Sequence, residues 1–255
     1  MTDQRQNRIA ALIKRIPTLT EGQVYWLDRV VQIFDCQHTY KSHRSNLLTA
    51  KMIDDFGDAL RIHHGFSFEP LSKDRFEYVL VQVLDMNGHA AVLAPKGNRG
   101  HDLTVDGCPI SVKTQANKNI QDNKIWISKF MELGKGKWGD NPDDLILLRK
   151  MYLDHLRGYD KIFTLRCLDR GPTWKYELVE IPKKTLKLAD NGELVMKMES
   201  RQFPKPGYCY VRDEQGEDIF QLYFDAGSER KLQIKNLLKT HCILHAEWEF
   251  FIPEK

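Results

Sequence analysis

The sequence predicts an α/β protein, for three reasons. Apolar residues recur at helical spacing near the amino terminus, several short runs of branched and aromatic residues are bounded by turn residues, and helical and strand-like segments alternate downstream. The 255 residues, of which 42% are hydrophobic and 29% charged, are enough to bury a sizeable core. No repeat or long Pro/Gly/Ser linker divides them, so we expect one cooperative domain.

Residues 1–65 are expected to form a mainly helical region that packs on a core made by residues 66–255. Apolar residues at helical spacing predict helices within residues 20–34 and, less strictly, 47–60. Ser72 is a suitable N-cap for a further helix, and the pair Asn87-Gly88 is a suitable end for it.

The segment after this helix is expected to form a β-hairpin. The dipeptide Asp106-Gly107 favours a tight turn, and it separates two strand-like runs at residues 101–105 and 110–114. Further strands are expected at residues 89–94, 125–128, 162–168, 175–180, 208–211, 219–224 and 242–252, and further helices at residues 129–133 and 145–156.

Composition excludes several classes of protein. No apolar stretch approaches the roughly 20 residues of a membrane-spanning helix, and the amino terminus lacks the apolar run of a secretory signal, so a cytoplasmic protein is expected. The five cysteines are scattered singly, which argues against a zinc ribbon or a disulfide framework. A net charge of +3 is too mild to identify a nucleic-acid partner by itself.

The hairpin is where the sequence predicts chemistry. Asp102 begins one of its strands and Lys113 ends the other, so both side chains are expected at the same end of the sheet. Hydrolysis of a phosphodiester needs an activated water and stabilisation of the negative charge that grows on the phosphoryl and leaving oxygens. A carboxylate-bound Mg²⁺ meets the electrostatic demand, and a lysine beside it favours deprotonation of the water.

These residues resemble the motif of the PD-(D/E)XK nucleases, in which a helix bearing Glu77 precedes Gly100-His101-Asp102 and then Ser111-Val112-Lys113. Within that superfamily the chain is similar to the SmaI-like type II restriction endonucleases. This resemblance extends over most of the chain and includes residues 100–102, 131–136, 162–166, 178–182, 204–208 and 229–235.

The resemblance implies a restriction-endonuclease-like fold, with a central mixed β-sheet flanked by helices. It also implies Mg²⁺-dependent cleavage of both strands of double-stranded DNA at a short, GC-rich palindrome, with Mn²⁺ as a substitute metal. A homodimer would read such a site with two-fold symmetry. A cognate DNA methyltransferase is expected as a genetic partner, because a restriction enzyme needs its host genome protected.

The motif is broken at Ser111, where the superfamily usually has Asp or Glu. A hydroxyl is a weak metal ligand, so another group is expected to compensate. Glu77 and Glu132 are the candidate acids, with Glu77 ranked first, and the amide oxygen of Gln115 is a third candidate.

Simpler interpretations remain open for these positions. Asp102 is also a residue type common in turns, Lys113 can be a solvated strand end, and Glu77 or Glu132 can lie on an exposed helix face. Two other functions also remain open. One is a repair or structure-selective nuclease, and the other is a DNA-binding protein that lost catalysis with the acid at position 111.

Basic residues near glycines and aromatics are the candidate DNA contacts. Lysines and arginines of this kind bind phosphates, and arginine also pairs with guanine, although most such clusters are solvated surface. Residues 227–231 are the segment expected to read bases. The candidate contacts are Arg99, Lys129, Lys135, Lys205, Arg230, Lys231 and Lys235.

Overall fold

The computed structural model of the chain describes residues 2–43, 45–95, 97–98, 100–134, 136 and 138–253. The helices are α1 (Thr2–Arg15), α2 (Glu21–Asp35), α3 (Ala50–Phe66), α4 (Lys73–Met86), α5 (Asp144–His155) and α6 (Lys183–Lys187), with short 3₁₀ turns η1 (Ile16–Thr18), η2 (Leu156–Gly158), η3 (Leu188–Asn191) and η4 (Lys239–His241). The strands are β1 (His38–Ser42), β2 (Ala91–Leu93), β3 (Leu103–Val105), β4 (Cys108–Gln115), β5 (Lys124–Glu132), β6 (Lys161–Asp169), β7 (Thr173–Glu180), β8 (Glu193–Met196), β9 (Gly207–Arg212), β10 (Asp218–Asp225), β11 (Lys231–Leu238) and β12 (Ile243–Phe251).

The described strands form two sheets. A seven-stranded sheet has the order β1-β12-β7-β6-β4-β3-β2, and a five-stranded sheet has the order β5-β11-β10-β9-β8. The larger sheet is mixed, because β4 and β6 pair in parallel while its other pairs are antiparallel. The predicted α/β class, with a mixed central sheet and flanking helices, is confirmed.

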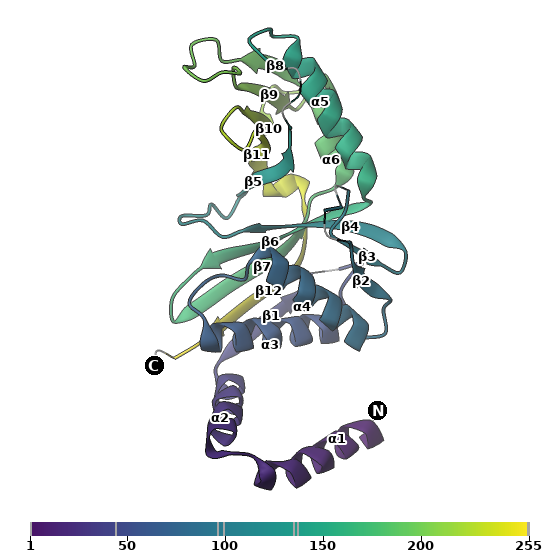
Figure 1. Ribbon diagram of the computed structural model, residues 1–255, viewed down its shortest axis with the longest axis vertical. Coiled ribbons are helices and arrows are strands. Elements are labelled where there is room, and N and C mark those ends of the chain that lie inside the picture. Colours follow the sequence, from purple (N-terminus) through teal and green to yellow (C-terminus); the bar gives the residue numbers. More distant parts are fainter. Residues whose placement is uncertain are drawn as a thin grey trace.

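The central sheet lies between two apolar cores (Figure 1). On one face it packs against α3 and α4, whose buried side chains include Phe56, Leu60, Phe76 and Leu80. On the other face, β6 and β7 contribute to a second core shared with α5, α6 and the five-stranded sheet. Helices α1 and α2 project away from this body at the amino-terminal end (Figure 1).

Local sequence signals specify α4 and the hairpin as predicted. The Ser72 hydroxyl accepts a hydrogen bond from the amide of Arg75, which caps the start of α4. Asp106 and Gly107 both have positive φ, 49° and 83°, as a tight type I′ turn requires. The turn places Val105 opposite Cys108 and joins β3 to β4 in antiparallel register.

The predicted helix at residues 129–133 is wrong. Strand β5 continues to Glu132, because Met131 and Glu132 pair with Leu232 and Lys231 of β11. A partner about a hundred residues away therefore overrides the local helical pattern. Strands β1, β8 and β11 were also not predicted, and β1 joins β12 of the central sheet, so the first 65 residues contribute a strand as well as helices.

Two smaller observations accompany the fold. In the described part of the chain, no helix is both long and apolar enough to cross a bilayer. All five cysteines are free thiols, as their single spacing predicted.

Arg166 of β6 connects the central sheet to the chain that leads to the second sheet. Its fully buried guanidinium donates to the Glu177 carboxylate, to Gln115 Oε1 at 2.9 Å, and to the carbonyls of Gln121 at 2.6 Å and Lys124 at 2.8 Å. A buried charge is tolerated only when it is paired and hydrogen-bonded. This arginine meets both conditions by fixing the segment between β4 and β5 against β6.

His64 of α3 is buried as a neutral ring. Its Nδ1 donates to the carbonyl of Ser67 at 3.1 Å, so its Nε2 accepts from the Tyr176 hydroxyl at 2.8 Å, and the ring stacks on Trp174 with centroids 3.5 Å apart. Burial, together with the neighbouring His63, lowers the pKa of His64 to about 3.

This histidine should make stability depend on pH in mild acid. Between the folded pKa of about 3 and an unfolded value near 6.5, the unfolded chain binds more protons. The free energy of unfolding should therefore fall as the pH is lowered through that window, by up to about 1.4 kcal/mol per pH unit from this group. Urea unfolding of His64→Phe should show a shallower pH slope than the wild type. Equal slopes for His64→Phe and the wild type would contradict the assignment.

Candidate functional site

Backbone hydrogen bonds fix Asp102 immediately before β3. Its amide donates to the carbonyl of Ile110 at 2.9 Å, and its carbonyl accepts from the amide of Ala94 at 2.9 Å. The side chain turns toward β4, where Oδ2 accepts hydrogen bonds from the Val112 amide at 2.7 Å and the Ser111 hydroxyl at 2.9 Å. The carboxylate is therefore held in one orientation by two donors.

Lys113 reaches the same carboxylate from β4. Its Nζ lies 3.9 Å from Asp102 Oδ2 and donates to the Ser111 hydroxyl at 3.1 Å, and its side chain is only 11% exposed. The Phe130 ring of β5 covers it, with the ring centroid 5.8 Å from Nζ. The predicted convergence of Asp102 and Lys113 is present in the structure.

Lys73 is a member of the site that sequence reasoning missed. From the first turn of α4 its Nζ lies 2.6 Å from Asp102 Oδ1 and 2.9 Å from Glu77 Oε1, so one ammonium bridges two carboxylates. The sequence could have predicted the Lys73–Glu77 ion pair, because these two residues are four positions apart on a predicted helix. Nothing in the sequence placed that helix against Asp102.

Burial and neighbouring charges shift the pKa values of Asp102, Lys113 and Lys73. Burial by itself raises the pKa of Asp102, but the charge of Lys113 and the hydrogen bond and charge of Lys73 together hold it below its usual range. Burial lowers the pKa of Lys113 to about 8, against the opposing attraction of Asp102. Lys73 has a raised pKa, because its contacts with Asp102 and Glu77 outweigh its burial.

His155 and Tyr159 form a further wall of the site that the sequence did not indicate. Burial and then the charge of Lys113 lower the pKa of His155 to about 4. Burial and then the charge of Asp102 raise the pKa of Tyr159, and within the described residues its buried hydroxyl has no hydrogen-bond partner. His155 is the last residue of α5 and Tyr159 follows η2, and the ring of His155 contacts those of Phe130 and Tyr159.

Two predicted site residues are placed elsewhere. Gln115 is 5% exposed and its Oε1 accepts from Arg166 Nε at 2.9 Å. Glu132 lies in the second sheet with its side chain 69% exposed and forms an ion pair with Lys129 at 2.9 Å. The structure thus brings together Asp102, Glu77, Ser111 and Lys113, and it does not show Gln115 or Glu132 in contact with them.

The donor set of the site fits a hard divalent cation. Asp102 and Glu77 offer carboxylate oxygens around one position that a cationic group, the Lys73 ammonium, already occupies. Mg²⁺ is commonly held by one or two carboxylates and keeps several waters. Among the residues that the structure describes, no three His, Cys, Asp or Glu side chains cluster as a typical zinc site requires.

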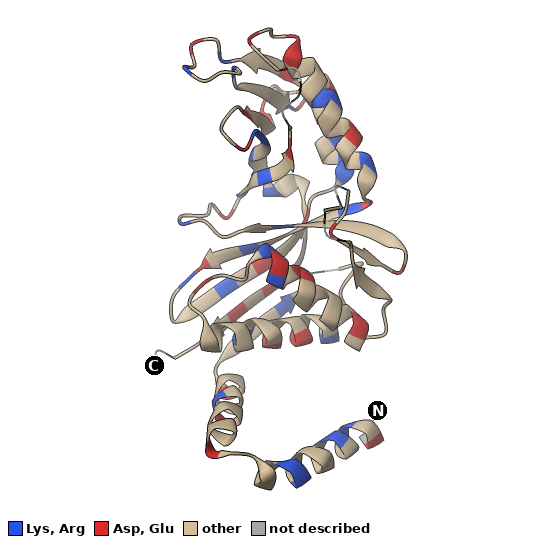
Figure 2. Ribbon diagram, in the orientation of Figure 1, with Lys and Arg blue, Asp and Glu red and all other residues tan. Residues whose placement is uncertain are grey.

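The predicted DNA contacts fall into different environments, with Lys/Arg and Asp/Glu interspersed along the ribbon (Figure 2). Lys129, Arg230 and Lys231 lie at the paired ends of β5 and β11, where Lys231 is opposite Glu132. Lys205 donates to the carbonyl of Ser200 at 2.6 Å, and the Lys235 ammonium lies 4.0 Å from the ring centroid of Tyr223. Arg99 and Lys135 lie outside the described residues.

Two glycines allow the segment that precedes Asp102 to approach the end of α5. A Cβ added to Gly158 would lie 2.8 Å from the Cα of Gly100, and a Cβ added to Gly100 would lie 3.2 Å from the carbonyl oxygen of Gly158. Backbone atoms cannot move aside as a flexible side chain can. The absence of a side chain at both positions therefore permits the close approach of the segment before Asp102 to the turn that follows α5.

Comparison with known proteins gives two matches. A family model described as SmaI, type II site-specific deoxyribonuclease, matches residues 12–250. The chain is 43% identical over 225 residues to the type II restriction enzyme SmaI of Serratia marcescens, an alignment that covers 88% of this chain and 89% of that enzyme. The region matched by the family model contains every residue of the site described above.

The glycine contact can be tested by substituting Gly158 with Ala. The new Cβ should push Gly100 away and weaken the hydrogen bond that the Asp102 carboxylate accepts from the Val112 amide. Loss of one such hydrogen bond should speed hydrogen exchange of the Val112 amide by roughly tenfold. Gly171→Ala is the matched control, because nothing lies within 4 Å of its added Cβ. If Val112 exchanges at the wild-type rate in Gly158→Ala, the contact does not position Asp102.

Proposed function

Because the chain belongs to the SmaI family of type II site-specific deoxyribonucleases, we propose that it cleaves both strands of duplex DNA through a Mg²⁺ site made by Asp102 and Glu77 beside Lys113. Membership of the family establishes the class of reaction. The metal, the residues that perform the reaction and the sequence that is cut are the proposed parts.

One observation supports this proposal above the others. Asp102 and Glu77 converge on a single position while the largely buried Lys113 ammonium lies 3.9 Å from Asp102. Two acids beside a lysine supply what phosphodiester hydrolysis needs, which is a place for a divalent cation and a group that acts on the attacking water.

Each residue has a separate task in this mechanism. Bound Mg²⁺ would supply positive charge to the phosphoryl oxygens of the scissile group. Lys113, with a pKa of about 8, can hold a water by hydrogen bonding and exchange a proton with it near neutral pH. The Ser111 hydroxyl and Val112 amide keep Asp102 oriented. Lys73 balances the two carboxylates. If those carboxylates held a metal, the Lys73 ammonium could donate hydrogen bonds to a phosphate oxygen instead.

The arrangement also supports assignment to the PD-(D/E)XK superfamily. Asp102, immediately before β3, and Lys113, on the paired strand β4 of a mixed sheet, match the acid and lysine positions of the motif. Ser111 keeps a structural role as a donor to Asp102. In this proposal, Glu77 of α4 supplies the carboxylate that the motif lacks at position 111, because it converges with Asp102 on the Lys73 ammonium.

The family resemblance extends the proposal to specificity and assembly. We propose a short, GC-rich palindromic site cut by a homodimer, in which each copy presents one catalytic site to one strand. Mn²⁺ is expected to replace Mg²⁺. A cognate methyltransferase encoded nearby would protect the host DNA.

We propose the DNA contacts on different grounds, because their side chains lie in different environments. Lys129, Arg230 and Lys231 lie together on exposed or half-buried ends of β5 and β11, where ammonium and guanidinium groups are accessible to phosphates or bases. Lys205 and Lys235 already contact a carbonyl and an aromatic ring. Arg99 and Lys135 are proposed from the sequence alone.

The function is tested by incubating plasmid DNA with the wild type, Asp102→Ala and Lys113→Ala. With Mg²⁺ the wild type should give discrete fragments, and each variant should cut at least about 100-fold more slowly while still binding duplex DNA. Intact plasmid after prolonged incubation of the wild type with Mg²⁺ or Mn²⁺ would instead indicate a DNA-binding protein. Cleavage restricted to branched or nicked duplexes would indicate a repair nuclease, and wild-type rates in either variant would refute the assigned site.

The second acid is tested by comparing Glu77→Gln with Glu132→Gln. Glu77→Gln should lose roughly 10- to 100-fold in cleavage rate and should show a smaller increase in Tm when Mg²⁺ is added, because one charged ligand is gone. Glu132→Gln, which changes an exposed carboxylate in the same way, should match the wild type in both measurements. The reverse pattern would assign the second ligand to Glu132.

A further inference from the structure

The amino-terminal arm, defined here as α1, η1 and α2, has an apolar surface that the rest of the chain leaves uncovered. Of the 25 large hydrophobic side chains exposed in the described residues, ten lie between residues 9 and 34. They are Ile9, Leu12, Ile13, Ile16, Val24, Tyr25, Trp26, Leu27, Val31 and Phe34. Isolated exposed apolar residues are ordinary, but a concentration of this kind marks an interaction surface.

Helix α1 has no packing of its own. Every described side chain of its 14 residues is exposed, and the helix projects away from the body (Figure 1). Helices shorter than about 12 to 15 residues are only marginally stable in water unless an apolar face is packed. Its apolar residues Ile9, Leu12 and Ile13, continued by Ile16 of η1, follow the spacing of one helix face, which is the pattern of a helix that binds in a groove.

Helix α2, in contrast, is firmly attached to the body. Ile33 is buried against Gly65, where an added Cβ would lie 2.0 Å from the Ile33 side chain. Arg61 of α3 donates to the carbonyls of Ile33 at 2.7 Å and Cys36 at 3.0 Å. The apolar stripe on the other side of α2 is therefore presented to solvent by a helix whose position is fixed.

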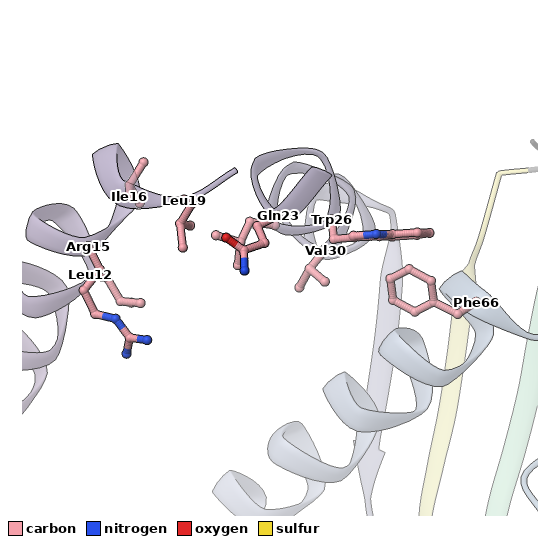
Figure 3. A pocket seen from close by; sticks show the side chains of 9 residues that line it. Leu12, Arg15, Ile16, Leu19, Gln23, Trp26, Val30 and Phe66 are labelled. Carbon is pink, nitrogen blue, oxygen red and sulfur yellow. The ribbon is translucent and has the colours of Figure 1, made fainter. Parts of the chain in front are cut away.

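An open groove of about 710 Å³ lies between α1, α2 and the end of α3 (Figure 3). Side chains from all three elements line it, including Leu12 and Ile16 from the first part of the arm, Trp26 and Val30 from α2, and Phe66 from α3. Trp26 and Phe66 contact each other with ring centroids 5.5 Å apart. The groove is mostly apolar and offers no cluster of polar groups for a small ligand.

The charges of the arm indicate which partner fits. Helix α1 has four basic residues and one acidic residue, whereas α2 has three acidic residues and one basic residue. Both helices are coloured by charge in Figure 2. A matching partner would bring a basic amphipathic helix to the acidic α2 and an acidic helix to the basic α1. A second copy of the same arm meets both requirements. Such a pairing is two-fold symmetric and closed, because α1 of each copy meets α2 of the other. The two helices total 29 residues, within the roughly 20 to 30 residues that each side contributes to a standard interface.

We propose that the arm is the dimer interface of this protein, with α1 of each copy bound along the apolar face of α2 and Phe66 of its partner. The proposal rests on the proposed function in one respect, since it specifies the surface through which two nuclease copies assemble. The assembly itself does not require DNA or metal.

Sedimentation velocity of the full chain over a dilution series without DNA tests the interface. Leu12→Glu with Ile13→Glu, at positions 55% and 63% exposed in one copy, should raise the dimer dissociation constant at least about tenfold without affecting the fold of the body. The matched control is Ile146→Glu with Leu147→Glu, an adjacent apolar pair on α5 that is 48% and 54% exposed. It should dimerise as the wild type does. A monomeric wild type, or an unchanged dissociation constant in the arm variant, would overturn the proposal.

Charge reversal gives a second, more specific test. Arg8→Glu with Arg15→Glu makes α1 acidic, and Glu21→Lys with Asp28→Lys makes α2 basic. Each variant alone should dimerise more weakly than the wild type, because α1 and α2 then have charges of the same sign. An equal mixture of the two should form heterodimers, in which both α1–α2 contacts are attractive. Absence of heterodimer from the mixture would contradict the pairing of α1 with α2.

The outcomes also separate this proposal from the proposed function. A wild type that cuts plasmid DNA into discrete fragments but remains monomeric would refute the arm interface alone. A wild type that dimerises through the arm but never cuts DNA would refute the proposed function alone. If the arm variant loses affinity for a metal-free duplex while its oligomeric state is unchanged, the arm binds DNA and the interface lies elsewhere.

Discussion

The alternation of side chains along β4 is the constraint on which both the core and the site depend. Ile110 and Val112 point into the core shared with α3 and α4, so Ser111 and Lys113 must point to the opposite face. A shift of one residue in the β3–β4 register would bury a lysine in an apolar core and remove Val112 from Asp102. The apolar packing of one face therefore fixes the polar geometry of the other.

The site is balanced in charge by its own side chains. Burying a carboxylate is costly unless a partner compensates, and here Lys73 and Lys113 compensate Asp102 while Lys73 also serves Glu77. The same low-dielectric surroundings bring the pKa of Lys113 down to about 8. A group that titrates near neutrality thus results from burial, and the folded body maintains that burial through two extensive apolar cores.

The amino-terminal arm follows a different physical rule from the body. In the body, apolar side chains are covered by the chain itself, and buried polar groups such as Arg166 are matched by several acceptors. In the arm, apolar side chains and unbalanced charges face solvent. Arg61 and Gly65 of α3 fix the position of α2, which carries part of this surface. A surface that is costly for one copy to expose becomes favourable when two copies cover each other. The proposed dimer interface and the proposed catalytic site thus belong to separate parts of the molecule.

The sequence alone determined the features that depend on neighbouring residues. The cap at Ser72, the Asp106-Gly107 turn and the period of the apolar positions predicted α4, the hairpin and the approach of Asp102 to Lys113, because each is specified within a few residues of chain. Only the tertiary structure placed Lys73 on Asp102, brought His155 and Tyr159 beside the site and extended β5 through residues 129–132 where a helix was predicted. These outcomes depend on contacts between segments far apart in the sequence, and local spacing contains no information about which distant segments will meet.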